Sequence, residues 1–382
     1  MMINGSYKRI LDLNKLLELK NFFLFGPRAT GKTSLIRAQL PDVRVYDLLD
    51  ADTFARLARR PKLLEEELVP GDSYLVIDEI QKLPSLLDEV QRLIDARKVR
   101  FLLTGSSARK LKRGGVNLLG GRAWEAALFP LTFSEISDFD WVTYFNRGGL
   151  PPSYLSKYFK EELHAYVSLY LKEEVMAEAL TRRIESFARF LDVMALQNGE
   201  ELSFQNLSSD CGVGAKTVQN YIQILEDTLV GFQVPAYLKT TKRKAITRSK
   251  FFFFDIGVVN SLAHRGEIFP KSDLFGRCFE HFLFLEIRAF LSYRRKHLPL
   301  QYWRSTSGYE VDCIVGNELA VEFKSTELAT GRHLKGLRAL MEEQKISKYM
   351  LVSLDPEPRV VDGIQIYPWK QFLSELWQDR II

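Results

Sequence analysis

The sequence predicts an α/β protein with an N-terminal parallel sheet, a helical middle part and a second α/β part at its C-terminal end. In residues 21–107, apolar runs of strand length alternate with helical patterns, which is typical of a parallel sheet covered on both faces. Residues 155–198 show no strand pattern, and strand patterns return near residue 300. The expected domains are residues 1–150, 151–265 and 266–382.

The composition narrows the class of protein. The 382 residues are 46% hydrophobic and 26% charged with a net charge of +5, which excludes disordered and collagen-like chains. The positive excess permits nucleic-acid binding without establishing it. Three widely spaced cysteines predict neither a disulfide scaffold nor a zinc site. No apolar run approaches the ~20 residues of a membrane span and no signal-peptide pattern is present, so we expect a cytoplasmic protein with no membrane partner.

The N-terminal elements follow from their local patterns. "NFFLF" predicts a strand that leads through a glycine-containing turn into a helix at residues 33–40. Pro61 is expected to break a helical pattern over residues 51–68. The other expected elements are a short amphipathic helix at 8–20, strands at 43–48, 73–80 and 99–107, and a helix at 86–96.

The later elements are expected in two groups. Residues 202–230 predict a helix, a glycine-containing turn and a second helix, and residues 232–257 predict two strands joined by a basic loop. A long apolar helix is expected from about residue 270, followed by strands near 300, 310, 320 and 350.

"GPRATGKT" at residues 26–33 fits the phosphate-binding pattern G-x-x-x-x-G-K-[ST]. Gly26 and Gly31 allow backbone N–H groups to curl around phosphate oxygens, Lys32 brings a positive charge to the β- and γ-phosphates, and Thr33 offers a hydroxyl to Mg²⁺. The pattern stands between a strand and a helix, which is the context that the chemistry needs. The remaining residues of the expected nucleotide site are Pro27, Arg28, Ala29, Thr30 and Ser34.

Acidic and hydroxyl side chains follow later strands. Asp78 is expected to hold Mg²⁺, and Glu79 to orient the attacking water for phosphoryl transfer. Thr104 is expected to reach the γ-phosphate or the water from a neighbouring strand end, with a turn hydroxyl as the alternative. Arg122 is a candidate for stabilising transition-state charge, within one chain or across a subunit boundary.

Five segments together resemble a prokaryotic family of AAA+-type ATPases that carries a C-terminal domain of unknown function. The segments are "GPRATGKT", "YLVIDEIQKLP", "LLTGSSARKL", "LLGGRAWEAALFPLTFSEI" and "GGLPPSYL". The resemblance implies ATP and Mg²⁺ as ligands and allows a homo-oligomer. Thr30 departs from the family pattern, which usually has a small apolar residue or glycine there, and "GGLPP" departs from the usual glycine–aromatic–proline segment.

The middle part resembles a winged helix. Apolar side chains in the second helix are expected to face the core, which places Lys216 and Thr217 outward at the end that usually enters a DNA groove. The basic loop would contact phosphates through Lys242, Arg243 and Lys244. A protein-interaction module is the alternative, because winged helices serve both roles.

"EVDCIVGNELAVEFKS" at residues 310–325 predicts a hairpin. A three-residue loop at 316–318 would place Val315 opposite Leu319 and Asp312 opposite Glu322. Regular alternation would then put Glu310, Asp312, Ile314, Ala320, Glu322 and Lys324 on one face and only apolar residues on the other. The same register would pair Glu310 with Lys324.

The acid, turn and Glu-x-Lys spacing resembles the PD-(D/E)XK nuclease pattern. The resemblance implies that Asp312 and Glu322 bind a divalent metal, that Lys324 positions a water, and that Glu280 on the preceding helix completes the site. Two functions remain open. One is an ATP-regulated nuclease acting on DNA, and the other is an ATP-dependent switch or scaffold whose inert nuclease fold binds DNA or a protein partner.

Overall fold

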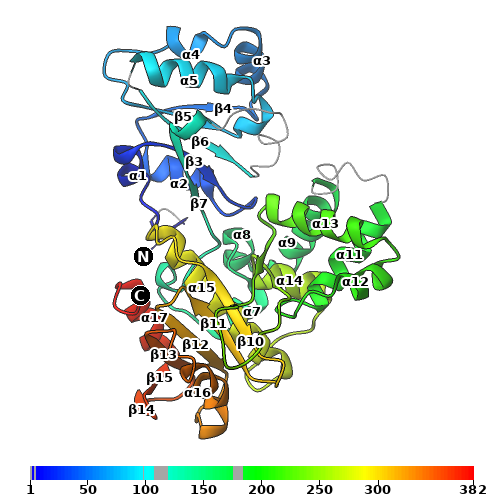
Figure 1. The fold of residues 1–382 in the computed structure, drawn as a ribbon. Coiled ribbons are helices and arrows are strands. Elements are labelled where there is room, and N and C mark those ends of the chain that lie inside the picture. The colour runs from blue at the N-terminus through cyan, green and yellow to red at the C-terminus, as the bar shows by residue number, and fades with distance from the viewer. Residues whose placement is uncertain (1, 4–5, 98, 107–118, 175–183) are drawn as a thin grey trace. The chain divides into compact units, whose positions relative to one another are not determined.

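A computed structural model describes residues 2–3, 6–97, 99–106, 119–174 and 184–382. These residues form two compact units (Figure 1). Unit 1 comprises residues 1–131 with 227–230, and unit 2 comprises residues 132–226 with 231–382. Among the described residues, no helix combines the length and the apolarity that a membrane crossing requires.

Unit 1 has a parallel sheet of five strands in the order β4-β5-β6-β3-β7. Strand β6 therefore lies between β3, which precedes the phosphate loop, and β5, which ends at Asp78. The elements of this unit are β1 (Met2–Ile3), β2 (Ser6–Tyr7), α1 (Leu13–Leu19), β3 (Asn21–Phe25), α2 (Lys32–Gln39), β4 (Arg44–Asp47), α3 (Ala51–Arg59), α4 (Leu63–Glu66), β5 (Tyr74–Asp78), η1 (Ile80–Lys82), α5 (Leu86–Arg97), β6 (Arg100–Gly105), η2 (Leu119–Gly121) and β7 (Ala123–Ala127).

Apolar side chains cover both faces of the unit 1 sheet. Phe23, Ile77 and Leu103 pack with Val90 of α5 in one core cluster. Strands buried on both faces need continuous apolar runs, which explains why β3, β5 and β6 were predictable. Strand β7 was not predicted, because its sequence "AWEAA" has low strand propensity and gains its place by pairing with β3.

Unit 2 begins with helices and ends with a mixed sheet. Its elements are η3 (Phe133–Glu135), α7 (Trp141–Arg147), α8 (Pro151–Leu155), α9 (Phe159–Ala165), η4 (Tyr166–Glu174), α11 (Ile184–Leu196), α12 (Phe204–Cys211), α13 (Ala215–Asp227), β8 (Gly231–Val234), β9 (Lys250–Phe253), α14 (Ile256–Leu262), α15 (Asp273–Tyr293), β10 (Leu300–Arg304), β11 (Glu310–Val315), β12 (Leu319–Lys324), η5 (Gly331–Leu334), α16 (Lys335–Met341), β13 (Lys348–Ser353), β14 (Arg359–Val361), β15 (Ile364–Pro368) and α17 (Trp369–Trp377). The predicted helical stretch 155–198 includes residues 175–183, which lie outside the described residues.

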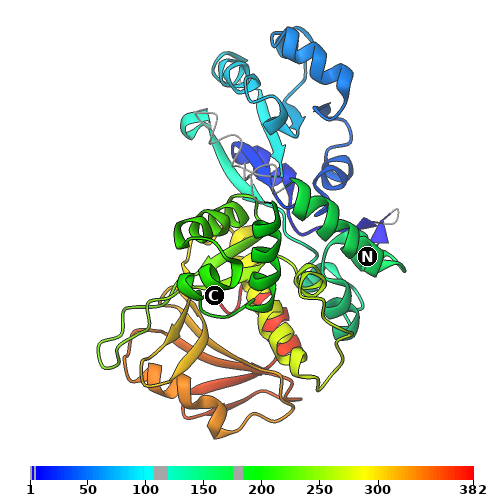
Figure 2. The ribbon, with the colours of Figure 1, turned by 90° about the vertical axis from the view of Figure 1, so that its right-hand side faces the viewer.

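The C-terminal sheet has six strands in the order β10-β11-β12-β13-β15-β14. Helix α16 packs against β11 and β12, while α15 and α17 pack on each other and against the sheet (Figure 2). Strands β14 and β15 were not expected from the sequence. The sheet therefore lies between helices, and β12 at its centre carries both Glu322 and Lys324.

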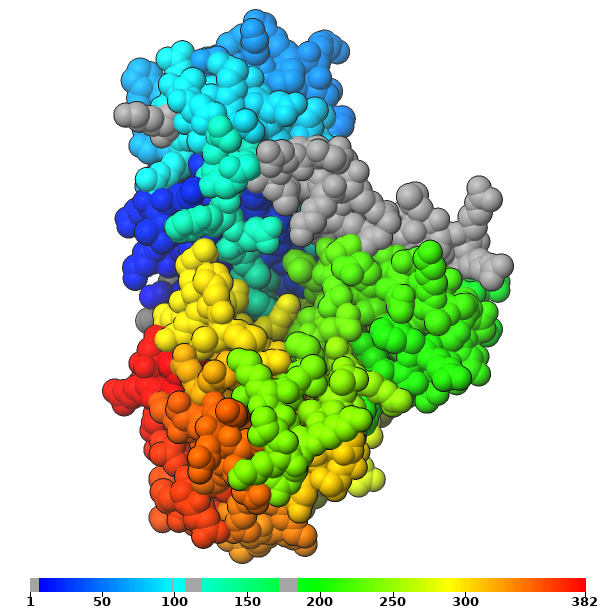
Figure 3. Space-filling view, viewed as in Figure 1, coloured from blue at the N-terminus to red at the C-terminus, as the bar shows by residue number. Residues whose placement is uncertain are grey.

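The loop of residues 235–249 joins β8 to β9 and pairs with the exposed edge of β10. Tyr237 N donates to Tyr302 O at 2.7 Å, and Ile246 N donates to Arg304 O at 2.8 Å. In the space-filling view, the yellow-green surface of this segment adjoins the orange surface of the C-terminal part of the chain (Figure 3). An uncovered edge strand invites pairing with other chains, so the loop closes this edge.

The side chain of Asp255 holds the "GGLPP" segment in place. Its buried carboxylate caps α14 by accepting from Val258 N at 2.9 Å, and it also accepts from Gly149 N at 2.7 Å. Burial raises the pKa of Asp255 to about 6, although these backbone N–H groups act in the opposite direction. The segment therefore anchors α7 and α8 to α14, and this contact is structural.

Candidate nucleotide and metal sites

The phosphate loop connects β3 to α2 in a conformation that its two glycines permit. A Cβ on Gly26 would lie 2.6 Å from Leu128 O, and Gly31 has a φ of 92°. Side chains are excluded at the first position by contact and disfavoured at the second by backbone strain. Lys32 Nζ donates to Gly26 O at 2.7 Å and to Pro27 O at 3.3 Å. Burial, which Glu79 and Asp78 partly offset, lowers the pKa of Lys32.

Asp78 links the loop to the neighbouring strands. Thr33 Oγ1 donates to Asp78 Oδ2 at 2.8 Å, and Thr104 Oγ1 donates to Asp78 Oδ1. Because β6 lies between β3 and β5, Thr104 at its carboxyl end meets Asp78 from the side. The structure thus brings together three residues that come from separate parts of the sequence.

Glu79 follows Asp78 in a left-handed conformation with φ 60°. Its backbone N donates to Thr104 Oγ1 at 3.2 Å, and its side chain accepts from Gln81 Nε2. Gln81 Nε2 also lies 3.3 Å from Ser106 Oγ. A non-glycine residue in this conformation is strained, so the turn that aims Glu79 is held by its surroundings. Sequence reasoning missed Gln81, although "DEIQ" places it two residues after Glu79.

Thr30 and Arg9 hold the loop from its other side. Thr30 is fully buried, and its Oγ1 donates to Pro27 O at 2.8 Å. Arg9 donates to Thr30 O at 2.7 Å and to Phe129 O at 2.5 Å. The hydroxyl at position 30 therefore closes the loop on itself, which accounts for the departure from a small apolar residue. No sequence pattern pointed to Arg9.

The other predicted loop residues lie around the same turn. Arg28 and Ser34 are exposed, and Ala29 has a φ of 65°. Ser34 belongs to the first turn of α2, whose N-cap is Gly31.

Arg122 lies at the end of the parallel strands that is opposite to the phosphate loop. It precedes Ala123, which pairs in parallel with Asn21 at the start of β3, whereas the loop follows Phe25 at the end of β3. The five residues of β3 separate these two ends by roughly 15 Å. Arg122 Nε instead lies 2.8 Å from Asp95 Oδ1. The structure does not bring Arg122 to the loop of its own chain, and action across a subunit boundary stays a prediction.

The residues predicted to contact nucleic acid lie in two places. Lys216 is exposed in the first turn of α13, and Thr217 beside it is half-buried. In the 235–249 loop, Lys242 and Lys244 are exposed. Arg243 lies 2.9 Å from Glu342 and donates to Ala339 O at 3.0 Å, so its guanidinium group fastens the loop to α16.

The hairpin register is as predicted near its turn. Val315 lies opposite Leu319, and Cys313 lies opposite Val321. Toward β10, however, Gln301 pairs with Ile314 and Trp303 with Val311, so β11 contains one extra residue at Asp312–Cys313. This β-bulge changes the direction of the side chains beyond it.

The bulge corrects two expectations. Regular alternation would place Val311 and Ile314 on opposite faces, but both pack in one core cluster with Leu337 of α16. Both faces of the hairpin are therefore largely buried. Glu310 was expected to pair with Lys324, but it lies 2.8 Å from Lys250 instead.

Glu280, Asp312, Glu322 and Lys324 are brought together with Lys250 in one charged cluster. Lys324 Nζ lies 2.6 Å from Glu322 Oε1 and 3.5 Å from Asp312 Oδ2, and Phe323 N donates to Asp312 Oδ2 at 2.8 Å. Lys250 Nζ lies 3.5 Å from Glu280 Oε1. Sequence reasoning did not connect Lys250 with these carboxylates, because Lys250 belongs to a strand 60 residues before β11 (250 against 310).

The pKa values in this cluster reflect burial first and the closeness of the carboxylates second. Burial, together with the charge of Asp312, raises the pKa of Glu280 to about 7 and that of Glu322 well above its usual value. Burial alone would lower the pKa of Lys324 and of Lys250, but the surrounding carboxylates raise both. Carboxylates crowded in this way gain stability from an added cation.

A further observation indicates that Asp312 and Glu322 could hold a divalent metal ion. Glu322 is 7% exposed, and its Oε2 atom is buried with no hydrogen-bond partner among the described residues. A metal ion would supply the missing partner. In the same described part of the chain, no group of three or more acidic, histidine or cysteine side chains has metal-binding geometry. Mg²⁺ commonly uses one or two carboxylates plus water and substrate phosphate, so two protein ligands suffice.

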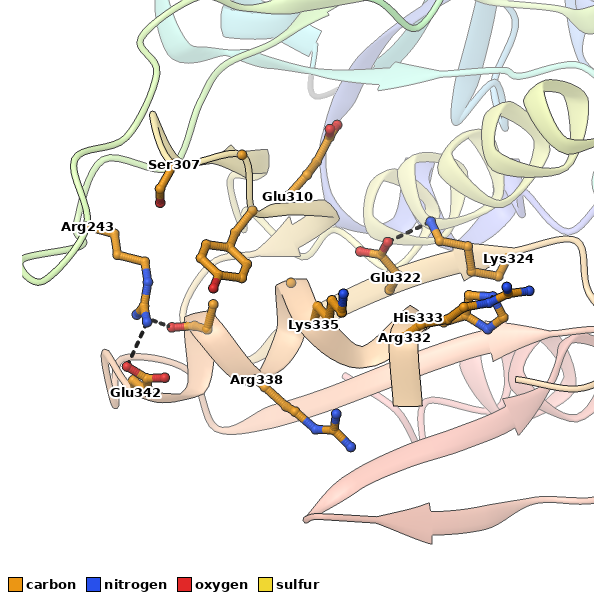
Figure 4. A pocket seen from close by; sticks show the side chains of 14 residues that line it. Arg243, Ser307, Glu310, Glu322, Lys324, Arg332, His333, Lys335, Arg338 and Glu342 are labelled. Carbon is orange, nitrogen blue, oxygen red and sulfur yellow. Dashed lines mark hydrogen bonds and ion pairs between the residues drawn. The ribbon is translucent and has the colours of Figure 1, made fainter. Parts of the chain in front are cut away.

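A hollow of about 690 Å³ opens beside Glu322 (Figure 4). In this view Lys324 points toward Glu322, and Lys335, Arg332 and His333 lie nearby. Arg243 of the 235–249 loop lines the other end. The buried Glu322 carboxylate lines a mainly basic hollow, which suits an anionic substrate that reaches a metal ion bound at Glu322.

Comparisons with known proteins divide the chain in three. Residues 19–137 match the family model described as AAA domain, residues 138–267 match a domain of unknown function (DUF8612), and residues 275–372 match another domain of unknown function (DUF4143). The chain combines an AAA domain with a DUF4143 domain. The first match contains the phosphate loop, Asp78, Glu79 and Thr104. The third match contains every member of the charged cluster except Lys250.

Two uncharacterized proteins illustrate the similarity over most of the chain. One, from Mycobacterium tuberculosis, is 24% identical over 342 residues, which cover 86% of this chain and 75% of the relative. Another, from Methanocaldococcus jannaschii, is 22% identical and covers 93% of this chain and 89% of the relative.

A solved signal transduction ATPase with numerous domains, from Pyrococcus horikoshii, matches with 13% identity and a TM-score of 0.23. The match covers 76% of this chain and 49% of that structure.

Proposed function

We propose that the chain binds and hydrolyses ATP in its AAA domain and thereby regulates a metal-dependent, nuclease-like site that acts on DNA. The hydrogen-bonded group of Thr33, Asp78 and Thr104 beside the phosphate loop is the observation that carries the ATPase part. The match of residues 19–137 to an AAA domain supports it.

The nucleotide would be held mainly by the loop backbone and by Lys32. On ATP binding, the ammonium group of Lys32 would exchange its contacts with loop carbonyl oxygens for contacts with the phosphates. Thr33 and Asp78 lie within hydrogen-bond distance of each other and suit the shared coordination sphere of Mg²⁺. Glu79 would orient the attacking water, and Thr104 would fix the peptide that aims Glu79. An arginine from a neighbouring copy, Arg122 included, would add to transition-state stabilisation.

In the C-terminal site, Asp312 and Glu322 would hold Mg²⁺ or Mn²⁺, which lowers the pKa of a bound water and offsets charge on a phosphodiester. Lys324 lies beside both carboxylates and would orient that water or neutralise the developing charge. The basic side chains around the hollow would hold the phosphates that flank the cleaved bond.

Nicking of supercoiled plasmid DNA with Mn²⁺ tests the nuclease part. We expect Glu322→Gln and Lys324→Ala each to reduce the nicking rate by about 100-fold or more, because each removes a group next to the reacting phosphate. Glu318→Gln, which alters an exposed acid in the turn of the same hairpin, is the matched control and should keep the wild-type rate. Equal background nicking by wild type and Lys324→Ala would refute nuclease activity.

A switch or scaffold with an inert nuclease fold is the second candidate. The absence of a three-residue metal group in the described part of the chain favours it. This alternative predicts ATP binding that depends on Lys32 together with DNA binding that is unchanged in Lys324→Ala. The plasmid assay separates the two functions, since only the first gives metal-dependent nicks.

DNA contact by the 235–249 loop is tested by the salt dependence of binding. Lys242 and Lys244 are exposed, and removing both by alanine substitution should reduce the slope of log K against log salt concentration by about 2, which corresponds to two phosphate contacts. The paired substitution Lys62→Ala and Lys82→Ala, at exposed positions in unit 1, is the control. An unchanged slope in the loop variant would show that the loop does not bind phosphate.

A further inference from the structure

Lys250 reaches the carboxylate cluster from outside the C-terminal domain. It is 5% exposed, and its Nζ lies 2.8 Å from Glu310 Oε1 and 3.5 Å from Glu280 Oε1. The ammonium group also lies 5.1 Å from the centroid of the Tyr302 ring, within the range of a cation–π contact. A buried ammonium group needs such partners, so these contacts define its place in the cluster.

The backbone around Lys250 fixes this position. Lys250 is the first residue of β9, where it pairs with Val234 of β8 and forms a bridge with Glu201. The loop that precedes it is paired with the edge of β10, and Tyr302 OH donates to Arg248 O at 2.6 Å. The side chain is therefore delivered to the cluster by paired strands, and it belongs to the segment matched as DUF8612.

The two lysines divide the four carboxylates into two groups. Lys250 lies between Glu280 and Glu310, whereas Lys324 lies beside Asp312 and Glu322. The first group already has a cation between its members. The second group contains the buried Glu322 Oε2 atom, which has no partner among the described residues.

The net charge of the cluster supports the same division of the carboxylates into two groups. A bound divalent ion favours the ionised form of the carboxylates beside it. In that state four carboxylates and two ammonium groups leave a net charge of −2, which one divalent ion balances. A second divalent ion would have to enter beside Lys250 and would meet its positive charge at close range.

We infer that Lys250 takes the place of a second metal ion between Glu280 and Glu310, so that the C-terminal site binds one divalent ion, at Asp312 and Glu322. The inference rests on the proposed metal site and specifies its stoichiometry. It makes Lys250 a positioning residue that holds Glu280 and Glu310 without touching the substrate. The site is then formed by residues of both the β8–β9 hairpin and the C-terminal sheet.

Mn²⁺ binding to the nucleotide-free full chain, followed by calorimetry and electron paramagnetic resonance, tests this stoichiometry. Without nucleotide, the AAA site lacks the phosphates that complete its own metal coordination. We expect one Mn²⁺ per chain for wild type and for Lys250→Arg, which keeps the positive charge, and two for Lys250→Met. Lys239→Met removes an exposed lysine from the 235–249 loop, which precedes Lys250, and this variant should bind one Mn²⁺.

The outcomes are distinct. Two ions in wild type, or one in a folded Lys250→Met variant, would overturn the role of Lys250 while leaving the metal site standing. No ion in wild type would remove the metal site itself and the inference with it. If Lys250→Met does not fold, Glu310→Gln replaces it. This variant should keep one Mn²⁺ while Asp312→Asn loses it, and loss of Mn²⁺ in a folded Glu310→Gln variant would overturn the inference.

Discussion

Glu79→Gln is expected to reduce the rate of ATP hydrolysis by at least about 100-fold while ATP binding is retained. The amide keeps the size of the side chain and the hydrogen-bonding turn, in which Glu79 N donates to Thr104 Oγ1 at 3.2 Å. It removes the negative charge that orients and polarises the attacking water. Phosphate release in the steady state and equilibrium binding of a fluorescent ATP analogue measure the two effects separately.

Lys32→Ala should differ from Glu79→Gln by losing tight ATP binding as well as hydrolysis. Lys32 is buried in the loop, where its Nζ contacts Gly26 O and Pro27 O at the place expected for phosphate.

The control for Glu79→Gln is Glu18→Gln, which removes an acid at an exposed position in the same unit. Hydrolysis at the wild-type rate in Glu79→Gln would show that another group orients the water.

The second large effect concerns the pH dependence of stability and involves Glu286 of α15. Its carboxyl group accepts from Phe133 N and from Trp377 Nε1, each at 2.8 Å, and it is 2% exposed. Burial raises the pKa of Glu286 to about 8, although both hydrogen bonds act to lower it. The group therefore keeps its proton in the folded protein at neutral pH.

The direction of the effect follows from the two pKa values. In the unfolded chain the carboxyl releases its proton near pH 4.5, whereas in the folded protein it does so near pH 8. Between these values the unfolded state binds fewer protons, so the free energy of unfolding falls as pH rises. The stabilisation is complete below pH 4.5 and lost above pH 8, with a total of roughly 4–5 kcal/mol as an upper limit.

Urea unfolding at pH 6, 7 and 8 measures this effect. Wild type should lose roughly 1 kcal/mol per pH unit from Glu286, whereas Glu286→Gln should show a flatter profile because its amide does not titrate in this range. The variant starts from a lower stability at pH 6, since the amide nitrogen cannot accept a hydrogen bond. Glu357→Gln, at an exposed site, should follow wild type. Parallel profiles for Glu286→Gln and wild type would refute the account.

The sequence was sufficient for elements whose pattern is local and strong. The apolar strands β3, β5 and β6, the break between α3 and α4 near Pro61, and the long helix α15 lie where the patterns predict them. Strand β7 has a sequence of alanine, tryptophan and glutamate, and only its neighbour β3 makes it a strand. Pairing between distant segments is not encoded in local periodicity.

The same limit applies to the candidate sites. The phosphate loop and the hairpin register were predictable because each lies within a few consecutive residues. The bulge at Asp312–Cys313 depends on the partner strand β10, and it redirected Glu310 toward Lys250. Arg122 was a candidate for stabilising transition-state charge within one chain or across a subunit boundary, and the parallel pairing of β7 with β3 puts it at the end of the strands away from the phosphate loop of its own chain. In each case the decisive information is the identity of the neighbouring strand.

The central claim is that the nucleotide state regulates the nuclease-like site. Plasmid nicking by Glu79→Gln, with and without ATP at saturating Mn²⁺, tests it most directly because this variant binds ATP without consuming it. Coupling between sites is typically 5- to 150-fold, so we expect ATP to change the nicking rate by about tenfold or more. The same nicking rate with and without ATP, in protein shown to have bound the nucleotide, would contradict the claim.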